Sequence, residues 1–510
     1  MAGRLEFGID FQNAGSSRGR RADPDAPMRL LLIGDFSGRG DLNLGEEPTL
    51  ARRQILAVDT DNFDQILARL KPSVRVAVPD APPLELSIST LDDFHPDRLL
   101  RRLEVFHALR DLRTRLQDPL QFAEAAAELG LPASPATGAA ASTSALSATE
   151  SDSSAVARLL GRSPATGEPS VAGAAAPSGV DAFVRALIAP HVVADTTAPQ
   201  RAQALAAVDA SMGETLRTVL HAPAFQALEA QWRGLRWLLD HLELDDQLQV
   251  HLLDITRAEL LADAQALHAD PQSSILRQRL AEPSAAGGEG QRWSVCVALF
   301  EVGALDDDLT WLSALGAVAA QAGAPTLATA AASLLGLDAF ERLPDPREWP
   351  PLAGPAATYW HALRQSDLAP WIGLAAPRLL MRQPYGAMTD PIEGISFEEF
   401  SGTPAHAHLL WAPASLGCAL LLGQAFREKG WAMQPGDLQQ ITDLPAYVVD
   451  RDRERQLQPC AEVLMSERAA LAIGERGIMA VASYKDRAEA RLVRFQSVAQ
   501  PPRALSGPWS

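Results

Sequence analysis

A stretch of low-complexity sequence divides the chain, and it restricts what the 510 residues can fold into more than any other feature. Residues 131–180 are roughly two thirds Ala, Ser, Gly and Pro. Such a composition offers too little apolar surface to offset the entropy lost when a segment becomes ordered. We therefore predict a flexible linker over 131–180 between two folded segments, residues 1–130 and 181–510.

The composition excludes several classes of partner. A net charge of −18 gives no counterion-release affinity for nucleic acid and disfavours anionic lipid. No apolar run reaches the length of a membrane span, and the N-terminus lacks the apolar core of a signal peptide. We predict a cytoplasmic protein with no direct membrane insertion. Three widely spaced cysteines, Cys296, Cys418 and Cys460, indicate buried thiols rather than a zinc site or a disulfide framework.

The segment LLLIGDFSGRG, residues 30–40, begins as many nucleotide-binding loops do, with an apolar run that enters a glycine-rich turn. The spacing of Gly34, Gly38 and Gly40 matches neither the phosphate loop, which needs a following Lys, nor the dinucleotide turn. Asp35 would also repel a phosphate. The pattern favours a strand that ends in a loop, and an enzyme with a nucleotide site at this sheet edge stays as a remote alternative.

The first segment is predicted to be a small α/β unit. Residues 5–11 alternate cleanly between apolar and other side chains, which indicates a strand. The further predicted elements are a strand over 29–36, a helix over 61–70 capped by Asp61 or Asn62, a hairpin of 74–78 with 84–89, and a helix that begins at Pro96. That last helix carries a single apolar stripe, formed by Leu99, Leu103, Phe106, Leu109, Leu112 and Leu116.

The second segment is predicted to alternate between helices and strands. Helices are expected over 213–242 and strands over 248–256 and 292–303. An Ala-rich helix from residue 309 leads into a buried segment that ends near residue 330. The predicted fold class is therefore α/β, with mixed sheets flanked by helices.

No catalytic template is present, because the chain contains neither G-x-S-x-G nor H-E-x-x-H. His406 and His408 would lie on one face of a strand and form half of a metal site, but no third ligand with suitable spacing is near. The cluster Asp92, Asp93, His95 and Asp97 fits either a metal or acid–base site or the N-terminal cap of a helix, and capping is favoured.

Two further pairs of charged residues have structural interpretations. Glu398 and Glu399 are adjacent, so on an extended strand they would face opposite ways and form a poor catalytic dyad. Arg233 and Arg236 lie among tryptophans and could stack on bases, but in an acidic chain a packed helix with its arginines at the surface is favoured. We predict no catalytic residue, no cofactor and no metal.

Several strings in the expected order resemble the contractile sheath of the type VI secretion system. ILAVDTDNFDQILARLKP and STLDDFHPDRLLRRL are similar to the small sheath subunit. The strings AQWRGLRWLL, APRLLMRQPYG, HLLWAPASLG and VRFQSVAQPP are similar to the large subunit. The residues that match the family motifs are Asp61, Asn62, Phe63, Asp92, Asp93, Phe94, Trp232, Arg233, Gly234, Leu235, Pro384, Tyr385, Gly386, Trp411, Gln496, Ser497 and Val498.

The resemblance implies a phage-tail-sheath-like fold and a structural role, with both subunits fused in one chain. Sheath protomers of this family polymerise helically around an inner tube on a baseplate and contract to drive the tube outward. The implied partners are other copies of the chain, the inner tube protein, baseplate components and a recycling AAA+ ATPase. The helix that this ATPase grasps has no convincing equivalent here; residues 154–161 are a weak candidate.

The alternating strand near the N-terminus is a candidate for donation to a neighbouring protomer, because main-chain pairing tethers bodies that rotate. Its apolar face consists of Leu5, Phe7, Ile9 and Phe11. The alternative is an ordinary strand of its own sheet. For the whole chain, the alternative within the same apparatus is an accessory cap, adaptor or assembly factor.

Overall fold

The computed structural model describes residues 21–42, 49–79, 82–118, 120–129, 200–281, 292–343, 345–400, 402, 405–451 and 454–509. These residues fall into two compact units. The first unit holds the described residues up to Leu103 and from Gly213 onward, and the second holds those between Glu104 and Met212.

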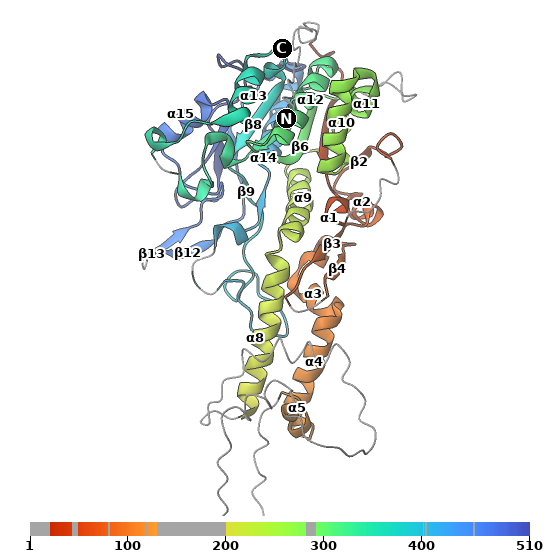
Figure 1. The fold of residues 1–510 in the computed structure, drawn as a ribbon, viewed down its shortest axis with the longest axis vertical. Helices are drawn as coiled ribbons and strands as arrows, with labels where there is room; N and C mark the ends of the chain where they lie inside the picture. The colour runs from red at the N-terminus through yellow and green to blue at the C-terminus, as the bar shows by residue number, and fades with distance from the viewer. Residues whose placement is uncertain are drawn as a thin grey trace, which may run out of the picture. The chain divides into compact units, whose positions relative to one another are not determined.

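A nine-stranded mixed sheet lies at the centre of the first unit (Figure 1). Its strands, in spatial order, are β11 (Gln440–Ile441), β15 (Ala490–Leu492), β14 (Met479–Ser483), β8 (Ile372–Ala376), β7 (Thr326–Ala330), β6 (Val295–Val302), β1 (Met28–Gly34), β5 (Leu248–Asp254) and β2 (Leu56–Val58). Pairing is parallel from β14 to β5 and antiparallel at both edges. The predicted mixed α/β character is confirmed.

Strand β1 comes from the first sequence segment but lies between β5 and β6 of the second. Its register runs from Met28 opposite Leu248 to Gly34 opposite Asp254. The residues of MRLLLIG are buried along the strand except for a half-buried Arg29, as a central parallel strand requires. The strand predicted over 29–36 therefore exists, ends at Gly34, and belongs to the large sheet rather than to a separate small one.

Helices cover both faces of this sheet. One face carries helices that share a single apolar core with the strands: α10 (Arg257–Ala269), α11 (Ile275–Leu280), α12 (Asp306–Ala322), α13 (Gly354–Gln365) and α15 (Glu467–Glu475). The other face carries α14 (Ala414–Lys429), and α9 (Pro223–Asp240) packs on α14. Gly234 allows the close approach of these two helices, because a Cβ there would lie 2.5 Å from Leu416 Cδ1 and would displace that side chain.

Shorter elements complete the first unit. Three two-stranded sheets pair β3 (Ser73–Val76) with β4 (Leu84–Ser87), β9 (Leu379–Leu380) with β10 (Trp411–Ala412), and β12 (Val448–Arg451) with β13 (Glu454–Leu457). The first sequence segment contributes to this unit the helices α1 (Arg39–Leu42), α2 (Phe63–Leu70) and α3 (Pro96–Arg102). The predicted hairpin and the helix start at Pro96 are confirmed.

The predicted cap of α2 is only half right. Asn62 occupies the N-cap position but makes no side-chain hydrogen bond to the helix. Its Oδ1 instead accepts a hydrogen bond from the Asp59 amide at 3.1 Å, and Asp59 Oδ1 accepts one from the Asn62 amide at 2.9 Å. Asp61 is exposed. The Asp59 and Asn62 side chains therefore stabilise the turn before the helix rather than its first turn.

The second unit contains α4 (Glu104–Gln117), α5 (Phe122–Glu128) and the first part of α8 (Gln200–Leu220). Arg113 Nε lies 2.6 Å from Asp209 Oδ1 and joins α4 to α8. The helix predicted from Pro96 through Leu116 is wrong at one position, because Leu103 has an extended backbone and separates α3 from α4. No Pro or Gly marks this break, so the apolar period alone did not reveal it.

Candidate functional site

Trp232 of α9 joins the two sequence segments. Its side chain is fully buried, and its Nε1 donates a hydrogen bond to the Phe36 carbonyl at 2.9 Å. The rings of Phe36 and Phe63 meet the indole edge-on, with centroids at 5.5 and 5.7 Å. Such edge-to-face contacts stabilise beyond the area that they bury. Two motif residues predicted from different segments, Phe63 and Trp232, are therefore in contact.

The glycine-rich loop after β1 is held by acidic side chains. Asp254, the last residue of β5, accepts hydrogen bonds from the Ser37 amide at 3.0 Å and the Ser37 hydroxyl at 2.9 Å. Asp35 accepts hydrogen bonds from the amides of Arg39 and Gly40, at 3.0 and 2.8 Å. Burial, reinforced by the charge of Asp254, raises the pKa of Asp35 to about 6.

This arrangement explains why the loop is rich in glycine without being a phosphate cradle. Gly38 has a φ of +70°, and a Cβ there would lie 2.2 Å from the Ser73 carbonyl oxygen. The amides that a phosphate would need are already bonded to carboxylates. The nearby cations are also paired, since Arg39 lies 3.0 Å from Asp254 and Arg53 lies 2.7 Å from Glu259. The loop closes the seam between β1 and β5.

A buried ion network lies on another side of α9. Arg382 Nε donates to Glu229 Oε1 at 3.0 Å, and its two terminal nitrogens donate to the two oxygens of Glu399 at 2.8 and 3.1 Å. Arg233 Nε donates to Glu229 Oε1 at 2.6 Å, and Arg233 Nη2 donates to the Tyr385 hydroxyl at 3.1 Å. We call Glu229, Arg233, Arg382, Tyr385 and Glu399 the α9 network.

Opposite charges dominate the electrostatics of the α9 network. Burial alone would raise the pKa of Glu399, but Arg382 and hydrogen bonds, including one from the Tyr385 amide, lower it to about 2. Burial would lower the pKa of Arg382, but Glu229 and Glu399 raise it well above its usual range. Burial raises the pKa of Tyr385 to about 12. The Glu399 carboxylate and the Arg382 guanidinium are therefore ionised at neutral pH.

The histidine pair does not lie on a strand as predicted. The segment His406–His408 forms a 3-10 turn and not a strand, so the two rings do not share a strand face. His408 stacks on His221 at 4.1 Å, and His221 Nε2 lies 3.3 Å from Glu399 Oε1. His406 packs beside Trp411. Among the described residues, no group of three His, Cys, Asp or Glu side chains is placed to hold a metal ion.

The cluster around Asp93 caps helices, as predicted. Thr90 and Asp93 form a capping box, and Asp93 Oδ2 accepts hydrogen bonds from the amides of Ser89 and Thr90 at 2.7 and 3.1 Å. His95 Nδ1 accepts one from the Asp97 amide at 3.2 Å and caps α3. The His95 ring meets Tyr385 edge-on at 5.0 Å, so this motif touches the α9 network.

Most of the remaining motif residues pack or make hydrogen bonds within the first unit. Phe94 meets Phe225 edge-on at 5.5 Å, and Leu235 and Pro384 are buried while Asp92 is exposed. A Cβ on Gly386 would lie 2.2 Å from Glu398 Oε2. Near the C-terminus, Gln496 donates to the Gly474 carbonyl, Ser497 to the Arg503 carbonyl, and the Val498 amide to the Ile372 carbonyl. Leu5, Phe7, Ile9 and Phe11 lie outside the described residues.

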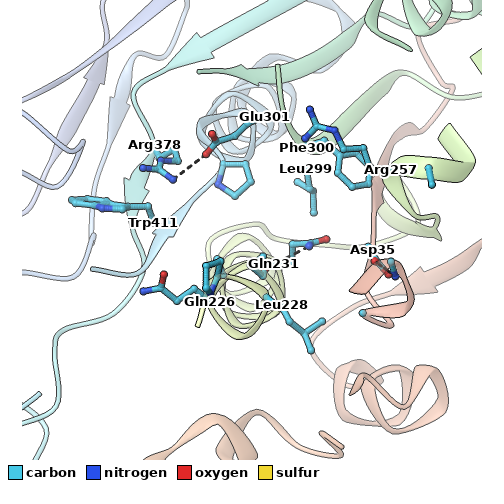
Figure 2. Close-up of a pocket in the computed structure, with 18 of the residues that line it drawn as sticks. Asp35, Gln226, Leu228, Gln231, Arg257, Leu299, Phe300, Glu301, Arg378 and Trp411 are labelled. Carbon is cyan, nitrogen blue, oxygen red and sulfur yellow. Dashed lines mark hydrogen bonds and ion pairs between the residues drawn. The ribbon is translucent and has the colours of Figure 1, made fainter. Parts of the chain in front are cut away.

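A pocket of about 760 Å³ opens above the carboxyl ends of β1 and β6 (Figure 2). Figure 2 shows Trp411 and Arg378 at one end of it, Asp35 and Arg257 at the other, and Gln231 of α9 between them. Leu228, Leu299 and Phe300 supply apolar wall. The Gln231 side chain is only 8% exposed, and its Oε1 has no hydrogen-bond partner among the described residues. Sequence reasoning placed a remote site near Gly34 but did not find this pocket.

The three cysteines are free and buried, as predicted. Burial raises the pKa of Cys296 and Cys418 to about 12 and that of Cys460 to about 11, so these thiols are unreactive. None of the described helices combines the length and apolar character needed to span a bilayer.

Two protein-family models match the chain. The model of the EvpB/VC_A0108 tail sheath N-terminal domain matches residues 202–499. The model described as type VI secretion system VipA, VC_A0107 or Hcp2 matches residues 9–129.

Two curated proteins of Pseudomonas aeruginosa are similar to different parts of the chain. The type VI secretion system sheath protein TssC1 is 27% identical over 304 residues, which cover 58% of this chain and 61% of TssC1. The sheath protein TssB1 is 30% identical over 102 residues, which cover 19% of this chain and 58% of TssB1. The chain thus spans about three fifths of the length of each of these relatives.

Proposed function

Because this chain belongs to the EvpB/VC_A0108 tail sheath family, we propose that it is a structural, non-catalytic subunit of a type VI secretion sheath. In this proposal, residues 1–130 act as the small subunit, residues 181–510 act as the large subunit, and residues 131–180 link them. Fusion makes the pairing intramolecular and fixes the ratio of the two at one to one. Other copies of the chain, an inner tube protein and baseplate components are the proposed partners, and a recycling AAA+ ATPase is a further one.

One observation carries the proposal: a strand of the small-subunit-like segment completes the sheet of the large-subunit-like segment. β1 pairs along its whole length with β5 and over four residues with β6. Trp232 then packs against Phe36 and Phe63 at this junction. β1 of the small-subunit-like segment therefore lies in one compact unit with the residues from Gly213 onward, as a sheath protomer that transmits force along a polymer requires.

We further propose that polymerisation uses strand donation. The strand 5–11 is the donor, with its apolar face of Leu5, Phe7, Ile9 and Phe11. Within the part of the chain that the structure describes, β12 and β13 pair only with each other, so this hairpin has edges open to another strand. Val448 on β12 is also exposed, which offers an apolar contact to the incoming strand.

The experiment is electron microscopy of the purified chain, alone and with its inner tube protein. Hollow helical tubes are the expected result. Monomers or small rings that bind only at sheath ends would instead assign an accessory role as a cap or adaptor. A protein that is folded but stabilised by nucleotide would indicate the enzymatic alternative, since a ligand that binds only the folded state raises its melting temperature.

Strand donation is tested with two proline variants. Gly8→Pro removes a ladder amide inside the alternating stretch and should abolish tubes. Gly15→Pro, which lies outside that stretch, should leave them intact. Equal tube formation by both variants would contradict donation by residues 5–11.

A further inference from the structure

Two imidazole rings and a phenyl ring form a layered stack just beyond the C-terminal end of α8. The His221 ring is nearly parallel to the His408 ring, with centroids 4.1 Å apart and planes 10° apart. It is also nearly parallel to the Phe400 ring, with centroids 5.3 Å apart and planes 12° apart. We call His221, Phe400 and His408 the ring stack. It joins the end of α8 to two later stretches of the chain, residues 397–400 and 405–409.

Two hydrogen bonds that also hold these stretches on α8 and α9 do not titrate near neutral pH. Gln226 Nε2 donates a hydrogen bond to the His408 carbonyl at 3.0 Å. Arg217 Nη2 donates one to the Glu398 carbonyl at 2.9 Å. An amide and a guanidinium keep their charge state at physiological pH, whereas an imidazole gains its charge between about pH 5 and about pH 8. The two histidines therefore make this attachment sensitive to protons near neutral pH.

A buried carboxylate faces the ring stack, and it is already shared with a cation. His221 Nε2 lies 3.3 Å from Glu399 Oε1, and the Glu399 side chain is fully buried. Arg382 donates to both Glu399 oxygens, at 2.8 and 3.1 Å. Glu399 therefore suits one protonated imidazole at most. A second proton, on His408, would place two like charges on rings whose centroids are 4.1 Å apart.

Further charged groups on α8, on α9 and in the two later stretches are held by other partners. They are Arg217, Glu229, Arg233, Glu398 and His406. Burial lowers the pKa of His408, and the charge of His221 lowers it further, against a smaller opposing effect of Glu399. The folded chain therefore disfavours a proton on the second imidazole.

We propose that the ring stack is a proton-operated clasp, which holds residues 397–400 and 405–409 on the end of α8 while at most one imidazole is protonated and opens when both are. Opening separates Phe400 and His408 from His221, and it admits water to Glu399 and the rest of the α9 network. The core of the large sheet is unaffected, because the ring stack lies outside it. The clasp belongs to the single chain, so its test does not depend on assembly into a sheath.

The clasp is strongest above the ordinary pKa of histidine and weakens in acid. The pKa of His408 is lowered from 6.5 in the closed state and returns to that value when the ring is freed. The closed state therefore binds this proton less tightly than the open state, so its stability is complete above pH 6.5 and declines below it. One unit below 6.5, a single proton raises the open fraction by about tenfold at most.

Hydrogen exchange of the full, unassembled chain tests the clasp. Exchange in residues 397–400 and 405–409 is measured about one unit above and about one unit below pH 6.5. The wild-type chain and each variant are compared at the same pH, which cancels the intrinsic pH dependence of amide exchange.

Two substitutions separate protonation from stacking. His408→Phe keeps an aromatic ring but takes up no proton, so it should match the wild type at the higher pH and exchange several-fold more slowly at the lower pH. His408→Gln removes the ring, so exchange should be fast at both pH values. The matched control is His361→Phe, at an exposed histidine of α13, which should behave as the wild type at both.

Each of three other results would overturn the clasp. Equal exchange by the wild type and His408→Phe at the lower pH would mean that the proton on His408 has no effect. Equal exchange by the wild type and His408→Gln at the higher pH would mean that stacking does not hold these residues. Acid exchange that rises equally throughout the chain would report global unfolding instead of a local opening. The formation or failure of tubes bears on the proposed sheath role alone.

Discussion

The seam, where β1 lies between β5 and β6, and the α9 network are on different sides of helix α9. They are built in opposite ways. The seam consists of apolar side chains and parallel backbone pairing, with Trp232 closing it. The network consists of buried charges around Arg382. Burial of apolar surface stabilises a fold outright, whereas a buried ion network roughly balances its own desolvation. The seam therefore supplies stability, and the network fixes where α9 stands.

Removing Arg382, the central cation of the α9 network, should cause the largest loss of folding stability. Arg382→Met removes the only guanidinium bound to the buried Glu399 among the described residues and leaves Glu229 with Arg233 alone, and it should reduce the free energy of unfolding by about 3–5 kcal/mol. Urea unfolding measures the effect. As a control, Arg75→Met removes an exposed pair with Glu85 and should change stability by no more than about 1 kcal/mol. Similar losses in both variants would contradict a buried, interdependent network.

The stability of the seam should depend on buried apolar volume rather than on charge. Ile33→Ala, near the carboxyl end of β1, removes a fully buried side chain from the core and should destabilise by about 2–4 kcal/mol. Met388→Ala, at an exposed position, is the matched control and should be nearly neutral. Thermal unfolding of both variants gives the comparison. A neutral Ile33→Ala would mean that β1 does not occupy the centre of the sheet.

The network should lose stability in acid. The pKa of Glu399 falls from 4.5 to about 2 on folding, so its contribution is complete above pH 4.5 and is lost as the pH falls toward 2. Glu399→Gln should remove this part of the pH dependence, which is followed by urea unfolding between pH 2 and pH 5, conditions set by those values. An unchanged profile in the variant would place the acid sensitivity elsewhere.

The seam should show a smaller pH effect of the opposite sign. The pKa of Asp35 rises from 3.8 to about 6, so the folded state binds this proton more tightly than the unfolded state. Its contribution is greatest at low pH and declines as the pH rises from 3.8 to 6. Asp35→Asn should flatten the profile in that window. A steeper decline in the variant would refute the assigned burial of Asp35.

The seam was largely predictable from sequence, and the network was not. A run such as LLLIG indicates a strand buried on both faces, because apolar content and β-branching are local properties. Its neighbours were not predictable, because β5 begins more than 200 residues later. Only the pairing in the structure shows which of the nine strands come from the first sequence segment and which come from the second.

The α9 network escaped prediction because its partners are far apart in sequence. Arg382 and Glu229 are 153 residues apart, and each reads alone as a surface charge. The expectation that Glu398 and Glu399 face different ways holds, since Glu398 accepts from the Ala387 amide and Glu399 binds Arg382. The strand assigned to His406 and His408 was wrong because three residues carry too little pattern to distinguish a strand from a tight turn.

Cleavage of the linker is the most direct test of the central claim, that β1 of the first sequence segment is an integral strand of the sheet formed by the second. A specific protease site is introduced within residues 131–180, the chain is cut, and the product is examined by native size-exclusion chromatography and thermal unfolding. The account predicts that both fragments co-elute and unfold in one transition, because β1 remains between β5 and β6. Separation of the fragments under native conditions, with the larger fragment still folded, would contradict it.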